Sequence, residues 1–445
     1  MGRGCSFLFS RSCSVASVYK GLSANGVFFR PYAGLRFPGT AKARLCRHSS
    51  PTLHLQCSTS VSYPERRESI ACVPLSERAA EYRSSVKDLL KWREWAQGMA
   101  MSVGDKYLLA DGGPNSNDLL RELEWMLEDA VSHILSLSMA SSSEDYQKPP
   151  PKIFQERPCV PLRMQEETTP VLQYRDASEF VKTLKRRGIK GLDVSELQSV
   201  VYLRASLEEL SNLWVERVHR RRPFQYIVSS AHWRDFVLFV KEGVLIPRPE
   251  TEQMIDLAQE VINAHPVLSE GVWADLGTGS GALSIGIASI LHPQGSVVAV
   301  DTSEEALFVA SINIQKYGFQ DKVKLRKGSW FSPLEDMKGK LAGILSNPPY
   351  IPSSHIPALQ AEVALYEPRC ALDGGEHGID DLFVICKGAT WALQSGGCII
   401  LETNGGDQAE SVGCFLERMQ SAPFCNVELI KDYAGVVRFV RACRK

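Results

Sequence analysis

The chain has 445 residues, of which 44% are hydrophobic and 23% charged, and its formal net charge is -1. These fractions lie near the averages of globular proteins and exclude a wholly disordered, collagen-like or coiled-coil protein. The length suggests two domains, or three, with enough residues for a sizeable core. No uninterrupted apolar run approaches the roughly 18 residues that cross a bilayer, so we expect no membrane-spanning segment and no membrane partner.

The start of the chain differs from the rest in composition. Residues 1–64 contain eight Lys or Arg, eleven Ser and no Asp or Glu. A segment rich in Arg and Ser and free of acids is typical of an organelle transit peptide, and an ordinary disordered tail is the alternative. We predict that residues 1–72 form this segment. Its length and Ile70-Ala71-Cys72, which resembles a processing site, favour a plastid over a mitochondrion.

Charge and cysteine usage exclude further classes of site. Beyond residue 64 the chain has 42 basic and 51 acidic residues. This acidic body speaks against stable binding to nucleic acid, because such binding relies on dense Lys and Arg. None of the 12 cysteines forms a C-x-x-C pair or lies at a zinc-like spacing from a His. We therefore predict free thiols in a reduced compartment and no metal.

Residues 73–222 are predicted to form a small all-helical domain. Apolar residues at helical spacing and capping-box patterns mark its helices. The expected helices are Ser76 to about Met101, Asn117 to Leu137, and two that open at Asp176 and Ser206. A Ser- and Pro-rich stretch at about 139–172 predicts a surface insertion in this domain.

The pattern then changes to β-type and to alternating helices and strands. Residues 223–247 are predicted to form a β-hairpin linker with strands at Tyr226–Val228 and Phe236–Val240. Residues 248–445 are predicted to form an α/β domain with a mainly parallel sheet and helices on both faces. Its expected helices are Glu252–Ala264, Ala282–Leu291 and Ser303–Tyr317, and its expected strands are Gly271–Leu276, Ser296–Val300, one near Val323, Leu341–Ser346 and Cys398–Glu402.

A glycine-rich turn follows the strand that is expected to end at Leu276. The residues predicted to lie at a cofactor here are Asp275, Gly277, Thr278, Gly279, Ser280 and Gly281. Glycines permit a tight turn and let a ligand lie against the backbone. Asp301 ends the next strand, where a carboxylate can accept hydrogen bonds from both ribose hydroxyls. The turn alone also fits a turn of no functional meaning, whereas the turn with Asp301 predicts a nucleoside site.

The spacing of the glycines selects among nucleoside cofactors. G-x-G-x-G differs from the dinucleotide pattern G-x-G-x-x-G, and no Lys-Ser or Lys-Thr follows it as in a phosphate loop. S-adenosylmethionine fits, with Asp301 at the ribose and the turn facing the methionine part. Trp330 is expected near the end of a following strand, where it either flanks the adenine or is a partly buried core side chain.

The run Asn347-Pro348-Pro349-Tyr350 follows the strand predicted at Leu341–Ser346. Methyl transfer to a planar NH2 group needs an aligned nitrogen lone pair, because conjugation makes that nitrogen a poor nucleophile. The Asn347 side-chain oxygen and the Pro348 carbonyl can each accept one N–H, and Tyr350 can stack on the acceptor. We predict that this tetrad is catalytic and binds the substrate, with Asn347 also at the cofactor. A plain Pro-Pro turn is the alternative.

Together these motifs resemble the HemK (PrmC) family of protein-glutamine N5-methyltransferases. The resemblance covers about residues 205 to 440 and is looser over the helical region. It rests on Asp275 to Ala282, Asp301, Trp330-Phe331, the tetrad, Ile246 to Glu252, Tyr366-Glu367-Pro368, Leu401-Glu402, Asp432 to Gly435 and Arg438.

The resemblance implies a fold and an activity. The fold is a class I, Rossmann-like methyltransferase domain with seven strands, preceded by a helical domain and a hairpin. The activity is transfer of a methyl group from S-adenosylmethionine to the glutamine of the Gly-Gly-Gln motif in a peptide chain release factor. Gly277 to Gly281, Asp301, Trp330 and Asn347 would then lie at the cofactor, and Asn347 to Tyr350 at the glutamine. Ser329 is a departure, because many relatives have Asp there.

Three alternatives remain open on the sequence. A ribosomal-protein glutamine is a second protein substrate that the tetrad does not distinguish from a release factor. Enzymes that methylate exocyclic amines of adenine or cytosine have a similar tetrad, although they must extract the base and usually add a basic recognition region. A non-catalytic scaffold that binds S-adenosylmethionine is disfavoured by the intact tetrad.

Overall fold

The structure is a computed structural model, and it describes residues 73–135, 197 and 199–445. The predicted transit segment, the Pro-rich insertion and the helix expected to open at Asp176 lie outside the described residues. Within the described part of the chain, no helix has both the length and the apolar character needed to cross a membrane.

The sheet domain is built on seven strands in the order β11-β12-β10-β9-β6-β7-β8. The strands are β6 (Val272–Leu276), β7 (Ser296–Asp301), β8 (Val323–Lys327), β9 (Leu341–Ser346), β10 (Leu393–Glu402), β11 (Phe424–Lys431) and β12 (Val437–Arg444). From β8 to β10 neighbouring strands are parallel, while β12 runs antiparallel to β10 and β11. The predicted seven-stranded, mainly parallel α/β sheet is confirmed.

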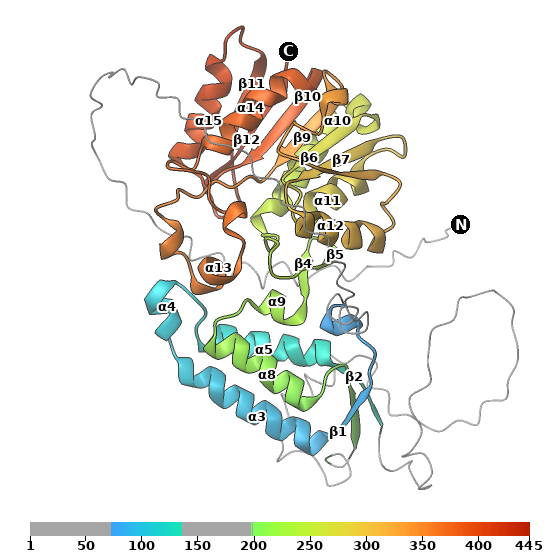
Figure 1. The fold of residues 1–445 in the computed structure, drawn as a ribbon, viewed down its shortest axis with the longest axis vertical. Coiled ribbons are helices and arrows are strands. Elements are labelled where there is room, and N and C mark those ends of the chain that lie inside the picture. Colours follow the sequence, from blue (N-terminus) through green and yellow to red (C-terminus); the bar gives the residue numbers. More distant parts are fainter. Residues whose placement is uncertain (1–72, 136–196, 198) are drawn as a thin grey trace, which may run out of the picture. The chain divides into compact units, whose positions relative to one another are not determined.

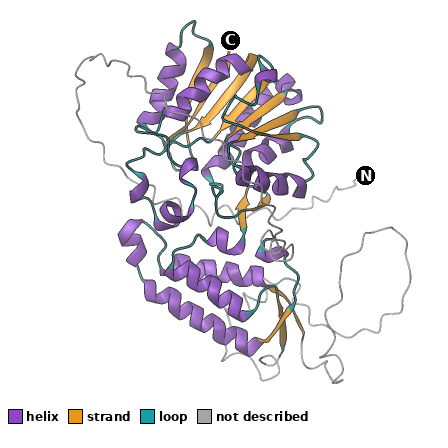
Figure 2. Ribbon diagram, viewed as in Figure 1, coloured by secondary structure: helices purple, strands orange, loops and turns teal. Residues whose placement is uncertain are grey.

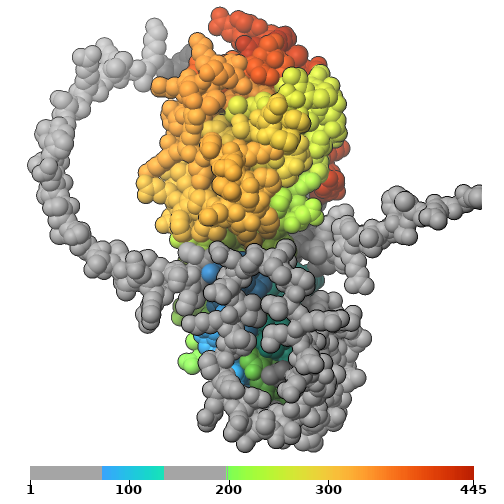
Figure 3. Space-filling view, turned by 90° about the vertical axis from the view of Figure 1, so that its right-hand side faces the viewer, coloured from blue at the N-terminus to red at the C-terminus, as the bar shows by residue number. Residues whose placement is uncertain are grey.

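Helices cover both faces of this sheet (Figures 1 and 2). They are α10 (Gln253–Ala264), α11 (Ala282–Ile290), α12 (Glu304–Lys316), α14 (Asp380–Ala392) and α15 (Asp407–Arg418). The short helix α13 (Ala361–Tyr366) belongs to the segment between β9 and α14 and does not cover the sheet. One apolar cluster joins α10, α11 and α12 to one face, and another joins α14 and α15 to the opposite face. Successive residues of a strand point to opposite faces, so Trp273 lies in the first cluster and Ala274 in the second. In Figure 3, the residues from the middle of this domain's sequence, coloured yellow to orange, form one continuous surface.

Local signals explain where the helices of the sheet domain begin. Ser303 caps α12, because its side chain accepts a hydrogen bond from the backbone N–H of Ala306. Gly281, with a φ of 84°, makes the left-handed turn from which α11 starts. Short 3-10 helices lie at Glu250–Glu252, Pro266–Glu270, Glu335–Met337, Ile356–Ala358 and Arg369–Ala371.

The helical module, residues 73–135, 197 and 199–228, is not all-helical, and that prediction is wrong. Its helices are α3 (Val86–Val103), α4 (Lys106–Asp111), α5 (Ser116–Ala130), α8 (Leu207–His219) and α9 (Phe224–Val228), with a 3-10 helix at Leu75–Glu77. A three-stranded antiparallel sheet is formed by β1 (Tyr82–Ser85), β3 (Val200–Leu203) and β2 (Val131–Leu135). Each strand has only four or five residues and pairs with a partner far away in sequence. The apolar residues of the neighbouring helices dominate the local pattern, so the sequence predicted helix for the whole region.

In this region two helix boundaries differ from the prediction and one agrees with it. The helix expected to begin at Ser76 begins at Val86, after a 3-10 helix and strand β1. The helix expected from Asn117 to Leu137 ends at Ala130, where β2 begins. Ser206 caps α8, with its hydroxyl accepting from the backbone N–H of Glu209, as the capping-box pattern predicted.

The hairpin is shorter than predicted and starts later. Residues Tyr226–Val228 belong to helix α9 and not to a strand. Helix α9 ends at Val228, and the next residue, Ser229, has a left-handed φ of 56°. The hairpin is formed by β4 (Ser230–Trp233) and β5 (Phe236–Phe239). Three bulky residues in a row suit a strand by propensity. Here Ile227 and Val228 pack in the core of the helical module, while Tyr226 packs in a small cluster with residues of the hairpin, so tertiary packing overrides the propensity.

Candidate active site

Three strand ends meet at one edge of the sheet. Leu276 of β6 is the register partner of both Val300 in β7 and Ser346 in β9. Paired strands lie about 5 Å apart, so the residues that follow these three positions leave the sheet side by side. The Ser346 hydroxyl donates to the carbonyl of Leu276 at 2.6 Å and ties two of the strand ends together. The glycine turn and the tetrad therefore start as neighbours.

The glycine turn is held by its backbone. Gly277, Gly279 and Gly281 have φ values of 78°, 55° and 84°, which L-amino acids with side chains rarely adopt. The N–H groups of Gly277 and Thr278 donate to the carbonyl of Val300 at 2.9 and 3.0 Å. The turn thus folds back onto β7, and its glycines leave the backbone open to close approach by a ligand.

Asp275 is fully buried below the turn. Its Oδ2 accepts hydrogen bonds from the hydroxyls of Thr278 and Ser284, both at 2.7 Å. Burial raises the pKa of Asp275 to about 6, although these hydrogen bonds act in the opposite direction. Its Oδ1 is buried with no hydrogen-bond partner among the described residues. A buried acceptor without a donor is costly, so this atom fits a site that a polar ligand group completes.

Asp301 lies one strand away and contacts the same turn. Its Oδ2 accepts from the N–H of Gly279 and its Oδ1 from the N–H of Ser303, both at 2.9 Å. Burial raises the pKa of Asp301 above its ordinary value, although the backbone donors act in the opposite direction. Each carboxylate oxygen has a second lone pair that can accept from a ribose hydroxyl. The donor and acceptor set therefore fits the nucleoside part of S-adenosylmethionine.

Trp330 packs against the glycine turn. A Cβ atom placed on Gly277 would lie 3.5 Å from the Trp330 ring. Trp330 has a positive φ of 47°, and its Nε1 donates to Asp381 Oδ1 at 3.1 Å. The ring also packs against the core cluster of α14 and α15. It thus borders both the core and the turn, and its contact with adenine stays a prediction.

A hydrogen-bond relay fixes the tetrad. Asn347 Nδ2 donates to Thr251 Oγ1 at 3.0 Å, and this hydroxyl donates to Glu402 Oε2 at 2.7 Å. The Tyr350 hydroxyl donates to the other oxygen, Glu402 Oε1, at 3.0 Å. Since the relay engages the NH2 end of the Asn347 amide, the carbonyl end is the one that can accept an N–H from a substrate.

Glu402 is the electrostatic centre of this relay. Glu402 is only 1% exposed, and this burial raises the pKa of its carboxyl group to about 6. The hydrogen bonds from Thr251 and Tyr350 and the charge of Arg438 act in the opposite direction. Burial and the charge of Glu402 also raise the pKa of Tyr350. The phenol therefore keeps its proton at neutral pH and acts as a donor to the carboxylate.

The tetrad begins the acceptor loop, residues 347–379, which joins β9 to α14, and its backbone is braced by α15 and by the rest of this loop. Gln408 Nε2 donates to the carbonyl of Tyr350 at 2.9 Å, and the N–H of Ile351 donates to the carbonyl of Leu372 at 2.9 Å. A Cβ on Gly374 would lie 2.7 Å from the carbonyl oxygen of Pro349, so only glycine fits at this close approach. The tetrad is consequently a rigid element.

The sequence patterns predicted no catalytic or binding role for Thr251, Glu402 or Gln408. Thr251 precedes α10, Glu402 ends β10, and Gln408 lies in the first turn of α15. The sequence contained one signal for Glu402, namely an acidic residue at the end of an apolar strand that is buried on both faces. Thr251 lies in the run Ile246 to Glu252 that carries the family resemblance, but no local pattern gives it or Gln408 a role, because their partners are distant in the chain.

Known proteins resemble this chain. A family model described as a methyltransferase domain matches residues 269–371. The release factor glutamine methyltransferase of Thermosynechococcus vestitus is 39% identical over 270 residues, which are 60% of this chain and 90% of that protein. Its counterparts from Gloeobacter violaceus and Synechocystis sp. are 42% and 40% identical, each over 54% of this chain and 80% of the relative. This chain therefore belongs to the family of S-adenosylmethionine-dependent release factor glutamine methyltransferases.

Proposed function

We propose that this protein methylates the side-chain nitrogen of the glutamine in the Gly-Gly-Gln motif of an organellar peptide chain release factor. The relatives support a release factor as the substrate, since each is named for that activity. The acceptor geometry supports a carboxamide, because the tetrad offers oxygen acceptors for an NH2 group and a flat side chain beside them.

On the cofactor side, S-adenosylmethionine supplies a methyl group on a positively charged sulfur, which is a good leaving group. Asp301 would hold the ribose, the backbone of Gly277 to Gly281 would face the methionine part, and Trp330 would flank the adenine. Asp275 lies beneath the glycine turn, and its buried Oδ1 would accept a hydrogen bond from a polar group of the cofactor.

On the acceptor side, the Asn347 side-chain oxygen and the Pro348 carbonyl would each accept one N–H of the glutamine. This arrangement turns the nitrogen lone pair toward the cofactor. Tyr350, held by Glu402 and Gln408, would stack on the amide plane. Most of the rate acceleration would come from proximity and orientation, which can lower a barrier by on the order of 7 to 11 kcal/mol.

One observation carries this proposal: Leu276 and Ser346 are register partners on neighbouring parallel strands. The turn that holds the cofactor and the tetrad that holds the acceptor leave the sheet from these two residues. A methyl group can pass between two ligands only when they are close and aligned. The register supplies that closeness without any movement of the sheet.

The test is to mix the purified protein and labelled cofactor with candidate organelle release factors and with a ribosomal-protein control. Mass spectrometry then locates the methyl group. We expect it on the glutamine of Gly-Gly-Gln. Label on the ribosomal protein alone would favour that protein as the substrate. Label on an oligonucleotide added to the same mixture would favour methylation of an exocyclic amine of adenine or cytosine. Cofactor binding without transfer to any substrate would indicate a scaffold.

We also propose a plastid location. The support is the composition of residues 1–64, with eight basic residues and no acidic ones. A fluorescent reporter fused behind residues 1–72 should enter plastids in plant cells. Entry into mitochondria instead would correct the organelle, and a reporter left in the cytosol would contradict a targeting role.

A further inference from the structure

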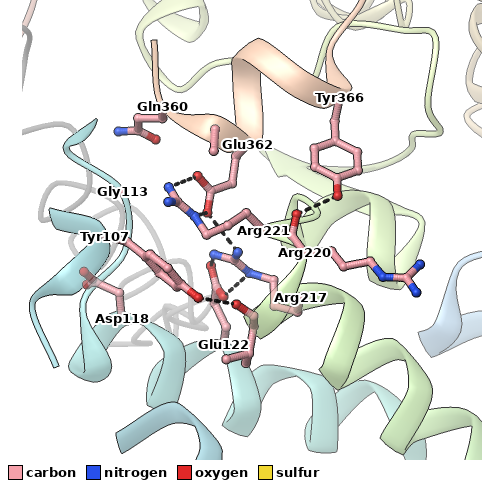
Figure 4. A network of polar contacts seen from close by, with 12 residues as sticks. Tyr107, Gly113, Asp118, Glu122, Arg217, Arg220, Arg221, Gln360, Glu362 and Tyr366 are labelled. Carbon is pink, nitrogen blue, oxygen red and sulfur yellow. Dashed lines mark hydrogen bonds and ion pairs between the residues drawn. The ribbon is translucent and has the colours of Figure 1, made fainter. Parts of the chain in front are cut away.

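Two arginines of the helical module meet one carboxylate of the acceptor loop. Arg217 Nη1 lies 3.0 Å from Glu362 Oε1, and Arg221 Nε lies 2.7 Å from the same oxygen. Arg221 also pairs with the second oxygen of Glu362. In Figure 4, Glu362 on α13 points between the two guanidinium groups. A single side chain of the acceptor loop is therefore held by two from the helical module.

Carboxylates of the helical module complete this network. Arg217 Nε and Nη2 donate to Glu122 at 2.6 and 2.9 Å, and Arg221 Nη1 and Nη2 donate to Asp111 at 3.2 and 3.0 Å. The side chains of Arg217, Arg221 and Glu362 are only 3%, 9% and 11% exposed. Buried ion pairs of this kind are strongly disrupted when one partner is removed, since a charge is then left unpaired.

Further hydrogen bonds from the helical module anchor the same segment. Asp111 Oδ2 accepts from the N–H of Ala361 at 3.1 Å, which caps the start of α13. Gln360 Nε2 donates to the carbonyl of Gly112 at 2.9 Å. The first turn of α13 is thereby fixed through both its side chains and its backbone.

The end of α13 is anchored as well. The hydroxyl of Tyr366 donates to the carbonyl of Arg220 at 2.6 Å, as Figure 4 shows. Glu367 Oε1 lies 2.6 Å from Arg248 Nη2, and Glu367 Oε2 accepts from the N–H of Ile246 at 3.3 Å. Residues 360–367 are therefore attached to the helical module and to the segment that leads into the sheet domain.

We propose that Glu362 is a positioning residue for methyl transfer, because it ties the acceptor loop to the helical module and so keeps the tetrad aligned with the glycine turn. This inference rests on the proposed function. The tetrad and α13 lie on the same loop, which the backbone bond between Ile351 and Leu372 makes compact. The helical module then serves the chemical step, in addition to any contact with the protein substrate.

The experiment compares the wild type with Glu362→Gln, Arg221→Gln and the double variant. We expect the transfer rate at saturating release factor and cofactor to fall by roughly tenfold to a hundredfold in each single variant, because a small misplacement of reacting groups has effects of that size. The double variant should lose little more than the worse single variant, since both substitutions break the same pair. Calorimetry should show a cofactor Kd within about twofold of the wild-type value.

A second readout does not depend on activity. Hydrogen exchange of the backbone amides in residues 347–372 should become faster in the variants, while amides of β6 and α10 should keep their wild-type rates. The matched control is Arg93→Gln, which breaks a similarly buried ion pair of 2.7 Å with Glu124 inside the helical module and should change neither readout.

Each contrary outcome has a definite meaning. A higher KM with an unchanged transfer rate would show that the network serves docking only and would overturn the inference. Unchanged exchange in residues 347–372 would overturn it as well. If Glu362→Gln fails to fold, Arg221→Gln decides, because Glu362 then keeps its bond to Arg217. A wild-type protein that methylates no release factor would instead refute the proposed function, and exchange would still test the network.

Discussion

The glycine turn and the tetrad lie at the same edge of one sheet but are built in different ways. The turn is local in sequence, since Asp275, Thr278, Ser284 and Asp301 all lie within two strand-helix units. The tetrad depends on Thr251, Glu402 and Gln408, which come from three distant elements. The proposed cofactor turn is thus formed by one local motif, whereas the proposed acceptor site exists only after the domain has folded. The two sites should therefore respond separately to substitution.

The largest separation is expected for Asn347→Ala. Loss of the side-chain oxygen leaves the acceptor nitrogen unaligned, so the transfer rate should fall by several orders of magnitude, about a thousandfold or more. Cofactor affinity, measured by calorimetry, should stay mostly intact. Equal loss of both quantities would contradict the division between the two sites.

Asp301→Ala is expected to give the opposite pattern. Two charge-assisted hydrogen bonds to the ribose would be lost, and the cofactor Kd should rise by roughly a hundredfold. The transfer rate at saturating cofactor should change much less. Asp336→Ala, at an exposed residue of the same domain, is the control and should leave the Kd unchanged. An unchanged Kd in Asp301→Ala would remove this residue from the cofactor site.

Glu402 should make stability depend on pH. Its pKa is about 6 in the folded protein, against an ordinary value of 4.5, because of burial. The folded state then binds the proton more tightly than the unfolded state, so the contribution of this group to stability falls as pH rises from about 4.5 to 6 and is constant above. The loss amounts to about 2 kcal/mol.

The measurement is the free energy of unfolding of the wild type minus that of Glu402→Gln at several pH values. Other carboxylates, Asp275 included, contribute equally to both proteins and cancel. A difference that does not change between pH 4.5 and 7 would show that Glu402 titrates normally and would weaken its place at the centre of the relay.

Thr251→Val should sharpen the comparison, because it keeps the shape of the side chain and removes only the hydroxyl. Asn347 would lose its acceptor and Glu402 one donor, so we expect the transfer rate to fall about tenfold with an unchanged cofactor Kd. Thr251→Ser restores the hydroxyl and should restore most of the rate. If the serine variant is as slow as the valine variant, packing and not the hydrogen bond is responsible.

The smallest effect is expected for Gln408→Ala. The variant removes the donor to the carbonyls of Tyr350 and Gly378, yet the prolines and the bond between Ile351 and Leu372 remain. The transfer rate should fall by only about threefold to fivefold, in line with one neutral hydrogen bond. A loss as large as that of Asn347→Ala would mean that the tetrad is less rigid than its backbone bonds indicate.

The sequence predicted the sheet domain closely and the helical module poorly. Strands such as β7 and β9 consist mainly of apolar residues beside glycine or proline signals, and such runs identify buried parallel strands. The strands β1, β2 and β3 are short and pair across long stretches of chain, so no local pattern marked them. Tyr226–Val228 has strand propensity but is helical, because Ile227 and Val228 pack in the core of the helical module and Tyr226 packs in a separate small cluster beside the hairpin.

The sequence by itself determined the residues that we propose for the chemistry: the glycines at positive φ, Asp301 at the end of a strand, and the stiff Asn-Pro-Pro-Tyr run. These are local properties of backbone conformation and side-chain type. Only the tertiary structure decided which end of the Asn347 amide is engaged, which carboxylate holds Tyr350, and which arginines hold the acceptor loop. The physical reason is that a buried polar group must find its partner in space, and here each partner lies far away along the chain.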